Sequence, residues 1–231
     1  MTETVQTVLT NLADTRKAKI LQGYFKTGKG EYGEGDMFLG ITVPQQRLVA
    51  KQFKDITLSE VEKLLKSTIH EYRFTALEIL ICKYETAEEK EQKQIVAFYL
   101  KNRKHVNNWD LVDTSAPYIL GDWLLSRDKA ILYKLVSSKG LWDRRIAIIT
   151  TYGFIRKGHF TDTLALAEML LNDPHDLIHK AVGWMLREVG KKSLKVEEEF
   201  LRKHHAHMPR TSLRYAIEKF PPDKRKHYLK R

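Results

Sequence analysis

The sequence predicts an all-α protein, and three observations indicate this fold class. Apolar residues recur at three- and four-residue steps along most of the chain, which is the period of an amphipathic helix. Helix-start signals precede several of these segments, and no run alternates as a half-buried strand would. No hairpin turn signal is found either. We therefore expect roughly a dozen helices joined by short connections.

The first helix is expected over residues 3 to about 24, where apolar residues follow helical spacing. The glycine-rich segment 28–36 then has the composition of a flexible loop. It lacks the glycine-lysine-serine/threonine ending of a phosphate-binding loop, and no strand pattern precedes it. We set a nucleotide-binding loop aside on these grounds.

Helix-start signals mark the next elements. Pro44 suits a first helical position, and the helix is expected to continue over 45–53. Thr57-Leu58-Ser59-Glu60 and Thr86-Ala87-Glu88-Glu89 both have the spacing of a capping box. Between them, residues 71–84 form a more continuously apolar segment, which predicts a central helix.

Two proline signals shape the second half of the chain. Pro117 is expected to end or kink the helix that begins near Trp109, with a second piece over 118–125. Pro221-Pro222 should end the helical pattern before a basic tail. Further helices are expected over 128–137, 142–156, 161–171, 176–189, 193–204 and 211–220.

These helices predict one helical-repeat domain over residues 1–231. Paired antiparallel helices stacked side by side, as in a HEAT-like α-solenoid, suit them because a single pair cannot bury its apolar face. Such stacking would produce a concave basic groove. The chain has no strict internal repeat, so a compact helical bundle remains an alternative.

The charge of the chain suggests an anionic partner. Its formal net charge is +11, and residues 180–231 hold fifteen basic and six acidic side chains, so most of the excess lies in the last quarter. A one-sided basic surface fits a phosphate backbone, although a basic protein without a nucleic-acid partner fits the composition equally well.

The single cysteine, Cys82, excludes a disulfide within the chain. It lies in an apolar run and is expected to be buried. The N-terminus does not resemble a leader, and no stretch has the length of a membrane span. We expect a cytoplasmic protein, as a monomer.

Trp109-Asp110-Leu111-Val112-Asp113 is the stretch with the clearest chemical content. Trp109 and Asp113 stand four residues apart, so they share one face of the predicted helix. A carboxylate beside an aromatic ring in a basic chain indicates chemistry on a polyanion. Asp110 is better explained by the helix dipole.

The sequence resembles the AlkD-like family of DNA alkylation repair glycosylases, which are built of HEAT-like repeats. In order along the chain, the resemblance lies in Phe38-Leu39-Gly40-Ile41 before Pro44, the stretch from Trp109 to Asp113, Leu141-Trp142-Asp143-Arg144-Arg145-Ile146-Ala147, and Gly183-Trp184-Met185-Leu186-Arg187-Glu188. It extends over nearly the whole chain.

The resemblance implies excision of positively charged N3- or N7-alkylated purines from double-stranded DNA, with no cofactor and no metal. It implies that Asp113 is the catalytic carboxylate, Trp109 its aromatic neighbour, Arg145 the supporting arginine and Trp184 a second aromatic. It also implies that Tyr24 corresponds to a tyrosine near the groove of the family. Further contacts with the DNA backbone are expected from Arg187, Lys191, Arg210 and Arg214.

Other readings stay open or are set aside. A non-catalytic helical-repeat protein that binds damaged or branched nucleic acid is the main alternative, and a protein-binding scaffold is a third. Trp123 and Trp142 are expected in the core. His175 and His179 stand four apart, but no third ligand is evident, so a metal site is not predicted.

Overall fold

The computed structural model describes residues 3–230, and in them the chain is all-α. It divides into two compact units, one ending at Ser115 and the other beginning at Ala116. Helix α7 (Trp109–Leu124) contributes to both units. Within residues 3–230 no strand forms, and the only β pairing is an isolated bridge between Met37 and Ile69. No helix in this part of the chain has the length and apolar character to cross a membrane.

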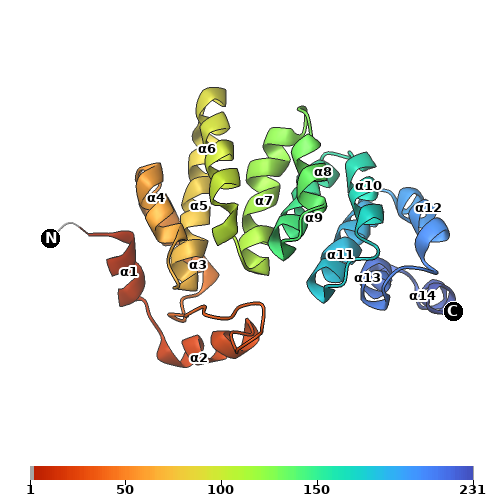
Figure 1. Ribbon diagram of the computed structural model, residues 1–231, viewed down its shortest axis with the longest axis horizontal. Coiled ribbons are helices and arrows are strands. Elements are labelled where there is room, and N and C mark those ends of the chain that lie inside the picture. The colour runs from red at the N-terminus through yellow and green to blue at the C-terminus, as the bar shows by residue number, and fades with distance from the viewer. Residues whose placement is uncertain (1–2, 231) are drawn as a thin grey trace. The chain divides into compact units, whose positions relative to one another are not determined.

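The first unit is built around α5, most of whose residues are buried. Helices α3 and α4 both pack against it, and α6 lies beside it (Figure 1). The central position predicted for segment 71–84 is therefore confirmed. The helices of this unit are α1 (Val5–Asn11), α2 (Thr15–Tyr24), α3 (Val43–Gln52), α4 (Leu58–Leu65), α5 (His70–Thr86), α6 (Glu89–Asn102) and the 3-10 turn η1 (Arg103–His105).

The second unit is built around α11, which packs against α9, α12 and α13. Its apolar face is fully buried, including Ile178, Val182 and Met185. The helices of this unit are the end of α7, α8 (Ala130–Val136), α9 (Leu141–Arg156), α10 (Thr161–Met169), α11 (Asp176–Lys192), α12 (Leu194–His204), α13 (Arg210–Ala216), the 3-10 turn η2 (Ile217–Lys219) and α14 (Pro222–Leu229).

Local start signals explain several boundaries. The Thr57 hydroxyl accepts from the Glu60 amide at 3.3 Å, and the Glu60 carboxylate accepts from the Thr57 amide at 2.7 Å. This reciprocal pair is the predicted capping box. Pro44 lies in the first turn of α3, where its missing N–H costs no hydrogen bond.

The capping box predicted at Thr86 is wrong. Thr86 is the last residue of α5, and its hydroxyl donates back to the Cys82 carbonyl at 3.2 Å. Helix α6 begins after Glu88, which makes no side-chain cap. Cys82 is half-buried rather than buried, and burial raises the pKa of its thiol.

The single N-terminal helix predicted over residues 3–24 is instead two helices. Asp14 ends the connection between α1 and α2, and its carboxylate accepts from the amides of Arg16 and Lys17 at 3.0 and 3.1 Å. Its own amide donates to Leu39 at 2.8 Å. The Asp14 N-cap and its hydrogen bond to Leu39 thus separate α1 from α2, although the apolar residues keep a helical spacing across both.

Pro117 does not end the helix, because α7 extends from Trp109 to Leu124 with Pro117 inside it, so the separate helix predicted over 118–125 is wrong. Ala116, Ile119 and Leu120 are fully buried around the proline. Burial of this apolar face offsets the missing hydrogen bond, which costs about 3 kcal/mol. After Pro221, the predicted basic tail forms helix α14 with Pro222 in its first turn.

Candidate functional site

The first turn of α7 presents Trp109 and Asp113 in the first unit. Both side chains are half-buried. The Trp109 ring stacks on Phe25 with centroids 5.2 Å apart, and Tyr24 meets it edge-on at 6.0 Å. Tyr24 is 63% exposed. The structure therefore brings Tyr24 and Trp109 together, one helical turn before a carboxylate that is not enclosed in the apolar core.

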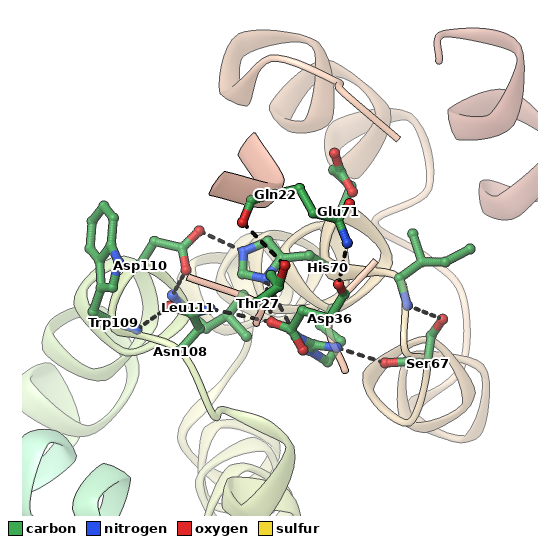
Figure 2. A network of polar contacts seen from close by, with 12 residues as sticks. Gln22, Thr27, Asp36, Ser67, His70, Glu71, Asn108, Trp109, Asp110 and Leu111 are labelled. Atoms are coloured by element: carbon green, nitrogen blue, oxygen red, sulfur yellow. Dashed lines mark hydrogen bonds and ion pairs between the residues drawn. The ribbon is translucent and has the colours of Figure 1, made fainter. Parts of the chain in front are cut away.

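A polar network of Asp36, His70, Arg73, Asn108 and Asp110 lies behind this turn, and all of these side chains except the half-buried Asp110 are buried. Figure 2 shows Asp36, His70, Asn108 and Asp110 of this network. The His70 ring nitrogens lie 2.7 Å from the Asp110 carboxylate and 3.2 Å from the Asp36 carboxylate. Arg73 pairs with Asp36 at 2.6 Å, and the side-chain amide of Asn108 donates to the same carboxylate oxygen at 3.3 Å. The network joins the end of the glycine-rich loop, α5 and α7.

The two carboxylates determine the charge of His70. Burial opposes a charged imidazole, but Asp110 and then Asp36 outweigh it and raise the pKa of His70 to about 8. Burial likewise opposes the charge of Asp36, yet His70 and Arg73 hold the pKa of Asp36 below its ordinary value. At neutral pH the network therefore contains two anions and two cations.

Glu71, next to His70 on α5, fixes the neighbouring loop. Its carboxylate accepts from the backbone amides of Leu39, Gly40 and Ile41 at 2.8 to 3.3 Å. Gly40 has a φ of +84°, and a Cβ there would lie 2.1 Å from the Asp14 carbonyl. The motif Phe38-Leu39-Gly40-Ile41 therefore has a structural reason: it closes over a buried carboxylate and against the start of α2.

A cavity of about 290 Å³ lies between α2 and this loop. Its walls are mainly apolar, and the polar residues of the lining include His70, Glu71 and Asp110 together with Lys17 of α2. Helix α2 has no buried residue of its own, so its apolar side chains face this cavity or solvent. The cavity lies beside the Tyr24 and Phe25 rings that contact Trp109.

In the second unit, Arg145 and Trp184 are held by α9 and α11. Arg145 is buried, and its guanidinium donates to the Leu177 carbonyl at the start of α11. It is thus no surface arginine. Trp184 is half-buried, lies 5.7 Å from the Tyr152 ring and donates from its indole nitrogen to Glu188 at 3.0 Å.

The basic residues predicted to bind a DNA backbone also lie in the second unit. Lys191 pairs with Glu188 at 2.6 Å, and Arg187 pairs with Glu218. Arg210 donates to the Leu229 carbonyl at 2.8 Å, and Arg214 is exposed on α13. Glu188 therefore joins Trp184 to Lys191 on one face of α11.

Several expectations for other residues need correction or explanation. Trp123 and Trp142 are half-buried and not in the core, and the Arg127 guanidinium lies 3.7 Å from the Trp123 ring centre. His175 caps α11 by accepting from the Leu177 amide at 3.1 Å. Within residues 3–230, no group of three His, Cys, Asp or Glu side chains is arranged to hold a metal ion.

Sequence reasoning missed the buried polar network and Glu71. Asp36 and Asp110 lie 34 and 40 residues from His70, so no local spacing joins them. A weak signal was available: His70, Glu71 and Arg73 are three charged or polar residues at the start of a helix that continues into a long apolar run. Polar groups in such a place must be paired when they are buried.

Comparisons with known proteins agree with this fold. Among solved structures, one described as a predicted DNA alkylation repair enzyme from Enterococcus faecalis is similar, with 18% identity, a TM-score of 0.72, and coverage of 91% of this chain and 97% of that chain. At that identity the likeness concerns the fold alone. No curated protein matches the chain. A family model described as DNA alkylation repair enzyme matches residues 5–220, and this chain therefore belongs to that family.

Proposed function

We propose that the protein is a DNA glycosylase that excises positively charged N3- or N7-alkylated purines from double-stranded DNA. Membership of a DNA alkylation repair family supports a DNA substrate. The observation that carries the finer proposal is the presentation of a half-buried Asp113 one turn after Trp109, whose ring contacts the exposed Tyr24.

The chemistry requires one carboxylate. An alkylated purine is already cationic, so it leaves as a neutral base without a general acid. Positive charge then develops on the deoxyribose, in an oxocarbenium-like transition state. The Asp113 carboxylate stabilises that cation and orients the attacking water. The Trp109 ring face attracts the cationic nucleotide, and Tyr24 extends the same aromatic surface.

The second unit supplies the remaining contacts in this proposal. Trp184 provides a second aromatic face, and Arg145 supports it by anchoring the start of α11. Arg187, Lys191, Arg210 and Arg214 bind backbone phosphates, which gives affinity without sequence preference. We propose that the helices form a HEAT-like solenoid whose concave basic groove holds the duplex, and that the protein acts as a cytoplasmic monomer without a cofactor.

The test is base release from a duplex that contains 7-methylguanine. Asp113→Asn should slow release by about 10² to 10³-fold, which is the loss expected for one preorganised electrostatic partner. Asp122→Asn is the matched control, since it removes an exposed acid from the same helix. Equal release by the wild type and Asp113→Asn would exclude the catalytic role of Asp113. No release by the wild type, with DNA binding that weakens steeply as salt rises, would favour the binding-only alternative.

A further inference from the structure

The first turn of α7, which carries Trp109 and Asp113, is held by the buried imidazole of His70. Asp110 lies directly after Trp109, and its carboxylate bonds to His70 at 2.7 Å and to the Leu111 amide at 2.9 Å. Figure 2 shows Asp110 pointing toward His70, with the Trp109 ring on its other side. A change in the His70 contact therefore acts on the backbone between the two proposed site residues.

His70 is rigidly placed at the first position of α5. Its ring stacks on Phe38 at 4.6 Å and is tilted against Phe25 at 4.9 Å, and Phe25 also stacks on Trp109. A cationic imidazole is favoured against aromatic faces. His70 is thus linked to Trp109 by two routes, through Asp110 and through Phe25.

The charged groups around His70 favour the protonated form of its imidazole. Asp36 faces it from the loop and Asp110 from α7, while Arg73 and Glu71 lie on α5 and Lys17 of α2 lines the adjoining cavity. With His70 charged, the buried network balances two carboxylates against two cations. Neutral His70 would leave an excess negative charge in a buried site, which is costly.

Loss of the proton affects Asp110 more than Asp36. A neutral imidazole has one N–H, so it cannot donate to both carboxylates. Asp36 keeps Arg73 at 2.6 Å and Asn108 at 3.3 Å. Asp110 loses the attraction of its cationic partner, and the first turn of α7 becomes less firmly held.

We propose that the imidazolium of His70, bound between Asp36 and Asp110, is the positioning residue that fixes Trp109 and Asp113 for base release. This inference rests on the proposed glycosylase function. The inference goes beyond that function, because it assigns the active state of the protein to one protonation state of His70, a residue that does not touch the substrate. Base release then declines as pH rises past about 8, where His70 loses its proton.

The experiment combines two pH titrations between pH 6 and 9.5. The first follows the His70 ring by NMR, and the second follows the rate of 7-methylguanine release after subtraction of spontaneous depurination. Both should show the same midpoint in the wild type. Asp110→Asn should lower both midpoints together by at least about one pH unit, because it removes the nearest opposite charge. His70→Gln should release base about 10- to 100-fold more slowly, without the alkaline decline.

A third measurement separates this inference from the proposed function. Fluorotryptophan NMR, with the Trp109 signal assigned by Trp109→Phe, reports the position of that ring without any need for base release. The Trp109 signal should move with the His70 titration in the wild type and should shift in Asp110→Asn, but not in Asp122→Asn. A Trp109 signal that ignores both changes overturns the inference, whether or not the protein releases base. A release rate whose alkaline midpoint is unchanged in Asp110→Asn overturns it too.

Discussion

Glu71→Gln should lower the stability of the first unit far more than its conservative size suggests. One carboxylate oxygen accepts from the amides of Leu39, Gly40 and Ile41 at 3.0, 2.8 and 3.3 Å, and the other accepts from Leu39 at 3.0 Å. Glutamine keeps one accepting oxygen, but it loses the charge and turns an NH₂ group toward a backbone N–H. Each hydrogen bond to a charged acceptor is worth about 1 kcal/mol more than a neutral one, so the three amides together lose about 2–4 kcal/mol.

Urea denaturation and thermal melting at neutral pH measure this loss. For a chain of this length, 1 kcal/mol corresponds to about 2–4 °C, so the melting temperature should fall by about 4–16 °C. Glu85→Gln is the matched control on the same helix. Glu85 is exposed, and removing a surface charge of this kind changes stability by less than about 1 kcal/mol. Equal and small losses in the two variants would refute the view that Glu71 holds the loop.

Three further predictions concern the free energy of unfolding. Burial and the neighbouring Glu198 raise the pKa of Glu197 from 4.5 to about 8, so the free energy of unfolding falls as pH rises between these values. Glu197→Gln should therefore raise the free energy of unfolding at pH 7 by about 1–3 kcal/mol, measured by urea denaturation. A lower stability of this variant would contradict the prediction. The pKa of His70 is raised from 6.5 to about 8, so its contribution of about 2 kcal/mol is complete below pH 6.5 and is lost as pH rises through 8. In His70→Gln the loss of stability between pH 6.5 and 8 should disappear. If that loss persists, another group causes it. Gly183→Ala should lower the free energy of unfolding by about 1–3 kcal/mol, because a Cβ there would lie 2.4 Å from the Ser212 carbonyl. Thermal melting measures this loss, and an unchanged melting temperature would show that α13 can move away.

The amino-acid sequence by itself determined the helical class and most of the elements. Apolar spacing predicted α9 and α10 to within a few residues, and the Thr57 capping box is formed by groups three residues apart. The candidate pair Trp109 and Asp113 also depends on local geometry alone, since residues four apart on a helix share a face. These features follow from short-range chemistry, which a single stretch of sequence contains.

Tertiary structure alone decided the rest. Burial of the flanking apolar residues kept α7 continuous through Pro117, whereas the hydrogen bond from Asp14 to Leu39 helped to divide a helix that periodicity favours. The charge of His70 depends on carboxylates 34 and 40 residues away. An ionisable group responds to whatever lies within a few ångströms once water has been removed, and folding is what selects those neighbours.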